Sequence, residues 1–301
     1  MSSNPAAGWS SRFRADLALV VIAFIWGATF ITTKSALAHS SVILFLAIRF
    51  SIASVALAGV YLFQREGWGG WRAVGGGTAA GTCLFAGYIL QTIGLKYTTA
   101  TKTGFITGLY VVVVPLLAAC VYRTVPRLLE VAGVAMAGLG MALMTLPKEG
   151  WALERGDALV ALSTIPYAAH LLLVVRFARW CSPVALGFYQ AATGAVIGLV
   201  VYRWAEEPFI QWDGQLVAAL LITGLLATAG AFTLLSWAQR STTATRSAVI
   251  LTLEPLFAWL TSLMVAGEQL SLRAGGGAIL ILAGILLVEL KPARQPEHPS
   301  P

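Results

Sequence analysis

The segment Thr98-Thr99-Ala100-Thr101-Lys102 recurs 144 positions later as Thr242-Thr243-Ala244-Thr245-Arg246. Extended without gaps over residues 98–147, the same offset gives thirteen identities in fifty positions. The matches include Ile106/Ile250, Leu109/Leu253, Gly133/Gly277, Gly140/Gly284 and Leu146/Leu290. Upstream, an offset of 141 pairs Asp16/Asp157, Trp26/Tyr167, Ala28/Ala169, Ser41/Ser182 and Arg49/Gln190. Self-similarity at a fixed spacing indicates an internal repeat, so we predict two halves, residues 16–147 and 157–291.

The composition places both halves in a membrane. Of the 301 residues, 58% are hydrophobic and 11% are charged, and the mean hydropathy is +0.79. Soluble domains, in contrast, carry charge at about a quarter of their positions. A bilayer-spanning helix needs about 20 mostly apolar residues. The segments that meet this requirement are 16–38, 41–63, 73–94, 102–122, 128–147, 157–176, 184–203, 215–237, 246–267 and 274–291.

An odd number of helices in each half turns the second half upside down relative to the first. Inverted repeats of this kind are the architecture of secondary transporters, whose substrate site lies near the bilayer midplane between the repeats. We therefore predict an all-α polytopic membrane protein, with ten transmembrane helices arranged as two inverted five-helix repeats.

Basic residues predict the orientation, because cytoplasmic loops carry an excess of Lys and Arg. With the N-terminus inside, twelve basic residues fall on the cytoplasmic side: Arg12, Arg14, Arg65, Arg72, Arg123, Arg127, Arg176, Arg179, Arg240, Arg246, Lys291 and Arg294. Six fall outside: Lys96, Lys102, Lys148, Arg155, Arg203 and Arg273. We expect both ends in the cytoplasm, as an N-terminal tail over residues 1–15 and a Pro-rich, disordered tail over 292–301.

The sequence contains few features of a disulfide-bonded, metal-binding, nucleic-acid-binding or catalytic protein. Cys83, Cys120 and Cys181 form no CxxC motif, so neither a disulfide framework nor a metal site is expected. The net charge of +7 is a loop bias and predicts no nucleic-acid partner. No hydrolase, kinase or redox motif is present, so we expect no enzyme and no cofactor. Coupling to protons stays open.

Four short motifs carry a family resemblance. They are Trp26-Gly27-Ala28-Thr29-Phe30, Ala47-Ile48-Arg49-Phe50, Gly104-Phe105-Ile106-Thr107-Gly108-Leu109-Tyr110 followed by Pro115, and Leu253-Glu254-Pro255-Leu256-Phe257-Ala258. In this order, over nearly the whole chain, they resemble the EamA-type ten-helix transporters of the drug/metabolite transporter superfamily. The resemblance implies a 5+5 inverted-repeat fold around a central cavity. It also implies a bacterial inner membrane and efflux of amino acids, metabolites or small drugs, without identifying the substrate.

An ionisable side chain inside a membrane span is expected to have a partner or a function, because inserting it into the bilayer costs at least about 2.5–3.5 kcal/mol on insertion scales. Glu254 precedes Pro255, which removes a backbone hydrogen bond and can kink the helix. The carboxylate is either a substrate or proton site or a permanently paired brace. Its repeat partner is Tyr110, so the two halves differ in chemistry at this position.

Three further ionisable groups each allow a functional and a structural interpretation. Arg49, paired in the repeat with Gln190, could bind Glu254, a substrate carboxylate or backbone carbonyls, or could simply lock a helix junction. Lys34 either lines the site or extends to the membrane surface. His170 is either a proton relay or a hydrogen-bonded packing residue.

Aromatic and small residues complete the prediction. Trp26 and Tyr167, with Tyr88, Gln91 and Tyr110, could line a pocket for a small molecule or could belong to ordinary packing. Glycines of the fifth and tenth helices predict close helix contacts, with these helices at the periphery and as a candidate dimer face.

We therefore expect an inner-membrane secondary transporter, an exporter of small amphipathic metabolites, amino acids or drugs that works by alternating access. The alternatives are an uncoupled facilitator of the same solutes, or a lipid-handling or sensory membrane protein on the same fold. The expected partners are a small-molecule solute and the lipid bilayer, with the chain as a monomer or a homodimer.

Overall fold

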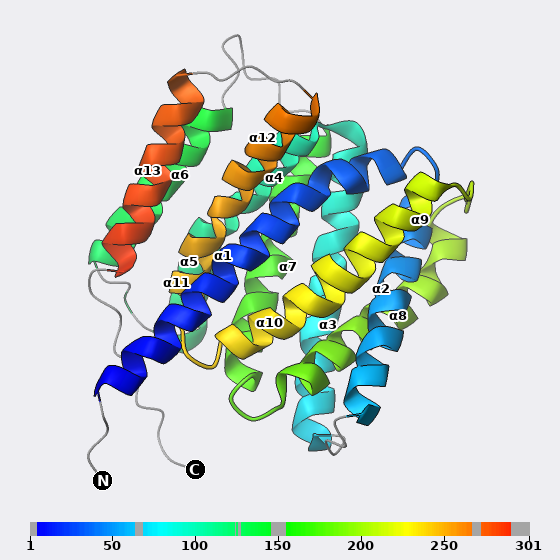
Figure 1. Cartoon of the computed structure of the whole chain (residues 1–301), viewed down its shortest axis with the longest axis horizontal. Coiled ribbons are helices and arrows are strands. Elements are labelled where there is room, and N and C mark those ends of the chain that lie inside the picture. The colour runs from blue at the N-terminus through cyan, green and yellow to red at the C-terminus, as the bar shows by residue number, and fades with distance from the viewer. Residues whose placement is uncertain are drawn as a thin grey trace.

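The computed structural model describes residues 5–63, 69–123, 125, 128–145, 155–266 and 272–289. Within these ranges the chain is helical, and no β-strand is formed (Figure 1). The first half contains α1 (Pro5–Ala36), α2 (Val42–Phe63), α3 (Gly70–Tyr97), α4 (Ala100–Gly108), α5 (Tyr110–Tyr122) and α6 (Leu128–Thr145). The second half contains α7 (Arg155–Phe177), α8 (Pro183–Ala205), α9 (Gly214–Leu221), η1 (Ile222–Gly230), α10 (Ala231–Ala238), α11 (Ala244–Leu251), α12 (Leu253–Ala266) and α13 (Leu272–Glu289).

These elements form ten helical rods in the described part of the chain, because three rods are interrupted. The interrupted rods are α4–α5, α9–η1–α10 and α11–α12. The predicted all-α, ten-helix membrane fold is thereby confirmed. The ends of several predicted spans, at 146–147, 267 and 290–291, and the tail 292–301 lie outside the described residues. α1 begins at Pro5, so residues 5–15 of the expected N-terminal tail are helical and continue into the first span.

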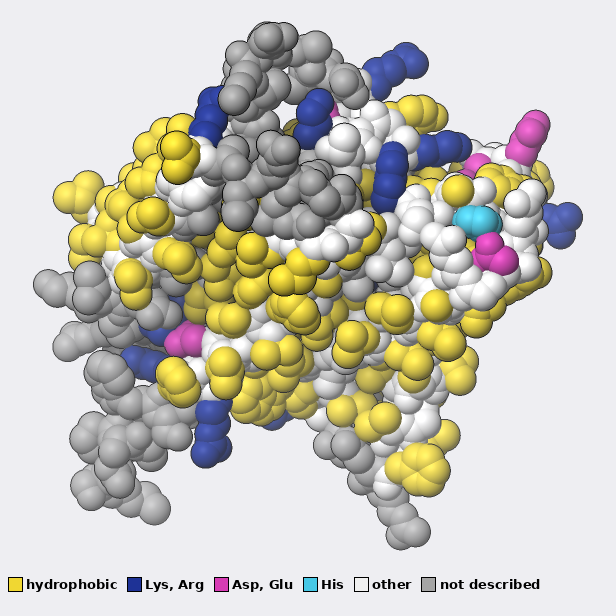
Figure 2. Space-filling view, turned by 45° about the horizontal axis from the view of Figure 1, so that its top comes forward, with side chains coloured by type: hydrophobic (Ala, Val, Ile, Leu, Met, Phe, Trp, Pro, Cys, Tyr) yellow, Lys and Arg dark blue, Asp and Glu magenta, His cyan; other side chains and the backbone are white. Residues whose placement is uncertain are grey.

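Apolar side chains cover the outside of the bundle. Within the described ranges, seven helical segments are long and apolar enough to cross a bilayer by themselves: Ser11–Ala36, Val42–Phe63, Gly70–Tyr97, Ala100–Tyr122, Arg155–Phe177, Pro183–Ala205 and Gly214–Ala238. Large exposed apolar residues such as Phe24, Val55, Leu116 and Val196 lie on this surface. Figure 2 shows a broad apolar band with basic and acidic side chains mostly toward its edges. This is a surface suited to lipid, and the protein is a multi-pass membrane protein.

The repeated Thr-Thr-Ala-Thr segment starts a helix in each half. The Thr99 side chain accepts a hydrogen bond from the Lys102 backbone N–H at the start of α4. Thr243 does the same for the Arg246 N–H at the start of α11. A threonine at this position satisfies an N–H group that the helix itself leaves unpaired. The duplicated sequence therefore fixes equivalent starting points for the two fourth rods.

Both fourth rods break near their middle. α4 ends at Gly108 and α5 begins at Tyr110, while α11 ends at Leu251 and α12 begins at Leu253. The break in the second half precedes Glu254 and Pro255, where the sequence predicted only a kink at the proline. Interrupted helices at membrane depth place free backbone groups beside a cavity, which is how many transporters build their sites.

Helix contacts repeat when the two halves are exchanged. α3 packs against α7, and the third rod of the other half, through η1 and α10, packs against α1. The contact of α3 with α8 corresponds to that of η1 with α2, and the contact of α1 with α12 corresponds to that of α7 with α4 and α5. This reciprocity is what two repeats related by a two-fold axis require.

The last helices of the two halves, α6 and α13, lie side by side at one edge of the molecule (Figure 1). Their backbones approach at two glycine contacts, so a Cβ on Gly140 would lie 2.5 Å from the Gly277 carbonyl oxygen, and a Cβ on Gly284 would lie 2.6 Å from that of Gly133. The peripheral placement agrees with the sequence. These four glycines face each other within one chain, so they do not form the suggested dimer face.

Candidate substrate site

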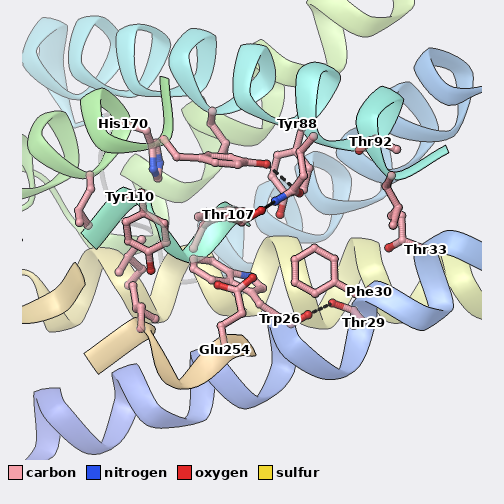
Figure 3. A pocket seen from close by; sticks show the side chains of 18 of the residues that line it. Trp26, Thr29, Phe30, Thr33, Tyr88, Thr92, Thr107, Tyr110, His170 and Glu254 are labelled. Atoms are coloured by element: carbon pink, nitrogen blue, oxygen red, sulfur yellow. Dashed lines mark hydrogen bonds between the residues drawn. The ribbon is translucent and has the colours of Figure 1, made fainter. Parts of the chain in front are cut away.

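A cavity lies between the two halves (Figure 3). Its lining comes from α1–α5, α7 and α10–α12: Trp26, Thr29, Phe30, Thr33, Arg49, Leu84, Tyr88, Gln91, Thr92, Leu95, Thr107, Tyr110, Tyr167, His170, Leu171, Phe232, Leu235, Leu251 and Glu254. Eight of the ten residues predicted from the sequence are among them. The exceptions are Gln190 and Lys34.

Glu254 lies in the first turn of α12, directly after the break at Thr252. Its side chain points into the cavity near Trp26 in Figure 3, and only 4% of the residue is exposed. No residue in the described part of the chain forms an ion pair or hydrogen bond with its carboxylate. The N-terminal end of a helix favours a negative charge, so the break itself contributes to holding the carboxylate in place.

Gly27 allows α1 to approach this break. A Cβ at Gly27 would lie 2.5 Å from the Glu254 carbonyl oxygen and 2.8 Å from the Ala258 nitrogen. Any larger residue would push α1 away from α12. The glycine of the first motif therefore places its neighbour Trp26 beside the glutamate.

Tyr110 occupies the equivalent place in the first half, at the start of α5. It is 6% exposed and lines the same cavity. Its hydroxyl group is buried and has no hydrogen-bond partner among the described residues. A buried hydroxyl without a partner costs free energy, so Tyr110 offers an unused hydrogen-bonding group to a molecule in the cavity.

Arg49, on α2, extends its guanidinium group to two hydroxyl groups. Nε donates to Thr228 Oγ1 at 2.8 Å, and Nη2 donates to Tyr88 Oη at 2.8 Å. The guanidinium carbon also lies 4.4 Å from the centre of the Tyr88 ring, a cation–π geometry. Of the alternatives open for Arg49, direct pairing with Glu254 is not formed in the structure. Its positive charge is held by neutral groups and faces the cavity.

A row of hydrogen bonds joins the two halves beside the cavity. Tyr167 Oη donates to Gln91 Oε1 at 3.0 Å, and Gln91 Nε2 donates to Thr107 Oγ1 at 2.8 Å. The rings of Tyr88 and Tyr167 meet edge to face, with centroids 5.7 Å apart. These contacts fix the aromatic side chains that form much of the cavity wall.

The π-helical segment η1 supplies two hydrogen-bond partners that no sequence pattern indicated. The Ala227 carbonyl accepts a hydrogen bond from Trp26 Nε1 at 2.9 Å, and the Thr228 hydroxyl receives Arg49. A π-helix shifts backbone bonding from i+4 to i+5 and often occurs at functional sites. Neither Ala227 nor Thr228 belongs to a pattern that distinguishes a π-helix from an ordinary apolar helix.

His170 and Gln190 form a pair at one side of the cavity. His170 Nε2 lies 2.6 Å from Gln190 Oε1, and the Gln190 amide donates to the Leu186 carbonyl. The His170 ring also meets the edge of Phe232. His170 is therefore a lining residue with a fixed hydrogen-bond partner, and Gln190 lies behind it.

Lys34 lies away from the cavity lining. Its ammonium group donates to the carbonyl oxygens of Leu95, Lys96 and Thr98 at the end of α3. A lysine in this place satisfies the carbonyl groups that a helix leaves unpaired at its C-terminus. The structure thus gives Lys34 a role in joining α1 to α3.

Ten helical rods, two of them broken beside a central polar and aromatic cavity, define a membrane transporter. Among the described residues, no cluster of His, Cys, Asp or Glu is arranged to hold a metal ion. A solved structure described as "Crystal structure of protein" has the same fold, with a TM-score of 0.73 over 92% of this chain and 96% of that chain, at 20% identity.

Sequence comparison gives the family. Residues 13–146 and 154–290 each match the EamA-like transporter family, and the chain belongs to that family. It is 34% identical to an uncharacterized transporter of Archaeoglobus fulgidus, over 93% of this chain and 87% of the relative. It is also 25% identical to the uncharacterized transporter YvbV of Bacillus subtilis, over 94% of both chains.

Proposed function

We propose that this protein is a secondary transporter of the bacterial cytoplasmic membrane, and that it exports small amphipathic solutes by alternating access. The observation that carries the proposal is Glu254, a buried carboxylate at a broken helix that faces an aromatic cavity without a partner among the described residues. Ionisable groups at membrane depth are costly and mark substrate or ion pathways. The residues 16–147 and 157–291 are the two units that move.

The lining supports a solute with an apolar body and charges of both signs. Glu254 offers a negative charge, and Arg49 offers a positive one. The bonds of Arg49 to Tyr88 and Thr228 use two of the five donors of a guanidinium group. The rings of Trp26 and Phe232 provide apolar faces for the body of the solute. Amino acids and amine-containing drugs have this chemistry.

The proposed orientation in the membrane is supported by the basic residues. Their excess on one set of loops favours cytoplasmic ends for the chain. A solute would enter from the cytoplasm and leave on the opposite side.

Three phenyl compounds that differ only in charge test the solute class in proteoliposomes. They are phenylalanine, which has both charges, phenethylamine, which has only the ammonium group, and 3-phenylpropionate, which has only the carboxylate. We expect phenylalanine to move fastest, and we expect Glu254→Gln to slow phenylalanine and phenethylamine. Equal rates for the wild type and Glu254→Gln with all three compounds would contradict the proposal. Movement of a fluorescent phospholipid in place of the solutes would support lipid handling.

Proton coupling through Glu254 has its own test. An imposed pH gradient should drive phenylalanine uphill in wild-type proteoliposomes, because a carboxylate in the cavity can carry a proton in one direction and release it on the other side. Glu254→Gln cannot exchange a proton and should lose this dependence on the gradient. Unchanged downhill flux in the wild type, with or without the gradient, would favour an uncoupled facilitator.

A further inference from the structure

Two ion pairs occupy equivalent positions in the two halves. Arg246 binds Asp16 through Nε at 3.0 Å and Nη2 at 2.6 Å. Lys102 Nζ lies 3.6 Å from Asp157 Oδ2. The repeat pairs Asp16 with Asp157 and Lys102 with Arg246, so each half contributes one acid and one base in the same arrangement. Each pair joins the start of a half's first rod to the start of the other half's fourth rod.

The two pairs lie at opposite ends of the bundle. Asp16 lies in the N-terminal half of α1, whereas Lys34, near the C-terminal end of that helix, binds the carbonyl of Thr98. The Thr98 hydroxyl in turn donates to Asp157 at 2.6 Å. Asp16 and Lys34 are separated by about 27 Å of helix at 1.5 Å per residue. We refer to these ends as the Asp16 end and the Asp157 end.

The cavity reaches only one of these ends. Thr33, Thr92 and Leu95 extend its lining to the last turns of α1 and α3, beside Thr98 and the Asp157 pair. Toward the other end the lining of the third rod stops at Leu235, seven residues before Thr242, whereas Leu95 lies only three residues before Thr98, the repeat partner of Thr242. The Asp16 end is therefore the closed one in this structure.

The ion pair at the closed Asp16 end has shorter contacts than the ion pair at the Asp157 end. At the closed end the pair is bidentate, and each partner's side chain is 15% exposed. At the other end Lys102 Nζ lies 3.6 Å from Asp157 Oδ2, and the side chain of Lys102 is 33% exposed while that of Asp157 is 7% exposed. Thr98 binds Asp157, whereas its repeat partner Thr242 has a buried hydroxyl with no hydrogen-bond partner among the described residues. The two halves thus contain the same set of interacting residues, but these residues are bonded differently at the two ends.

We propose that the pairs Asp16–Arg246 and Asp157–Lys102 are the two gates of the transporter, one tight while the other is loose. Opening the Asp16 end separates Arg246 from Asp16 and lets Thr242 bind that carboxylate, as Thr98 binds Asp157 here. Closing the Asp157 end brings Lys102 and Asp157 together. The proposal rests on the proposed alternating access, and it adds four residues that do not touch the solute.

Thiol labelling in nanodiscs tests the gates without any solute. In a chain with Cys83, Cys120 and Cys181 replaced by serine, Thr33→Cys reports the Asp157 end and Ser247→Cys reports the Asp16 end. Ser247 is fully buried beside Arg246, and its hydroxyl donates to Gln239 Oε1. A maleimide should therefore label Ser247→Cys slowly while the Asp16 end stays closed.

Asp16→Asn should raise the labelling rate of Ser247→Cys by about tenfold, which corresponds to a shift of about 1.4 kcal/mol between the two states, and lower that of Thr33→Cys. Asp157→Asn should act in the opposite direction on both reporters. The swap Asp16→Arg with Arg246→Asp should restore slow labelling of Ser247→Cys. If Asp16→Asn does not accumulate, Arg246→Lys replaces it and should give a smaller rise, since lysine keeps the charge but loses the bidentate bond.

Asp213→Asn is the matched control. Asp213 pairs with His39 at 2.9 Å outside the repeat pattern and accepts the Leu216 N–H at the start of α9. Asparagine caps a helix as well as aspartate does, so this variant removes a charge alone and should leave both reporters unchanged. Unchanged labelling in Asp16→Asn, or a rise of both reporters in both gate variants, would overturn the gates. Because no solute is present, an absence of transport would contradict the proposed function and leave this result intact.

Discussion

The two fourth rods have the same shape and different chemistry. Each begins with a threonine cap and breaks in the middle, and each places the first turn of a new helix at the cavity. In the first half that turn carries Tyr110, a neutral hydroxyl, and in the second it carries Glu254, a carboxylate. The scaffold is therefore duplicated while the charge is not. Glu254 is the one acidic residue among the described residues that line the cavity.

The first rods of the two halves also share a contact and differ in the chemical groups that make it. Tyr167 of the second half bonds to Gln91 on α3, and its repeat partner Trp26 bonds to the Ala227 carbonyl on η1. Each aromatic residue thus binds the third rod of the other half. One half provides a side-chain amide for this bond, and the other provides a backbone carbonyl through its π-helix. The halves have diverged in how they make the contact, and the contact itself is retained.

The largest effect on transport should come from removing the charge that distinguishes the fourth rod of the second half from that of the first. Glu254→Gln removes the charge and keeps the size, and hydrogen bonds to charged groups contribute about 1.5–3 kcal/mol. Phenylalanine flux should fall by about tenfold or more, whereas Tyr110→Phe should cost only a few-fold. Flux measurements on equal amounts of reconstituted protein give the comparison. A greater loss in Tyr110→Phe than in Glu254→Gln would reverse the roles assigned to the two halves.

The glycine contacts should give the next effect, on stability. A methyl group at Gly284 would lie 2.6 Å from the Gly133 carbonyl oxygen, whereas at Gly275 it would meet nothing within 4 Å. Gly284→Ala should therefore destabilise the protein by about 1–3 kcal/mol, the usual cost of overpacking. Gly275→Ala should be neutral or slightly stabilising, because alanine favours helix. Thermal unfolding in detergent compares them, and equal melting temperatures would argue against a tight α6–α13 contact.

The smallest effect should come from the bond between Arg49 and η1. Thr228→Val removes the hydroxyl that receives Arg49 Nε and donates to the Thr223 carbonyl. An ordinary intramolecular hydrogen bond contributes about 0.5–1.5 kcal/mol, so the melting temperature should fall modestly. Thr228→Ser keeps the hydroxyl and is the control. If valine and serine behave alike, Tyr88 alone is enough to hold the guanidinium group.

The sequence predicts the helical rods well because the length of each apolar segment determines where a rod can form. It predicts most of the cavity lining because polar residues inside membrane spans are rare. The duplicated Thr-Thr-Ala-Thr segment even marks where the fourth rods start. The breaks at Leu109 and Thr252 escape prediction, since whether a carbonyl stays unpaired depends on what the neighbouring rods offer it. For the same reason the sequence could not assign Lys34 to the end of α3, or Arg49 to Thr228.

The seam between α6 and α13 constrains how the molecule can move. No residue of either helix lines the cavity within the described part of the chain, and their glycines place backbone against backbone. Because the backbones meet directly at these glycines, we expect the two halves to stay in contact along this edge. We expect the two halves to rotate about this edge as rigid bodies, with the largest displacement at the rods farthest from the α6–α13 contact.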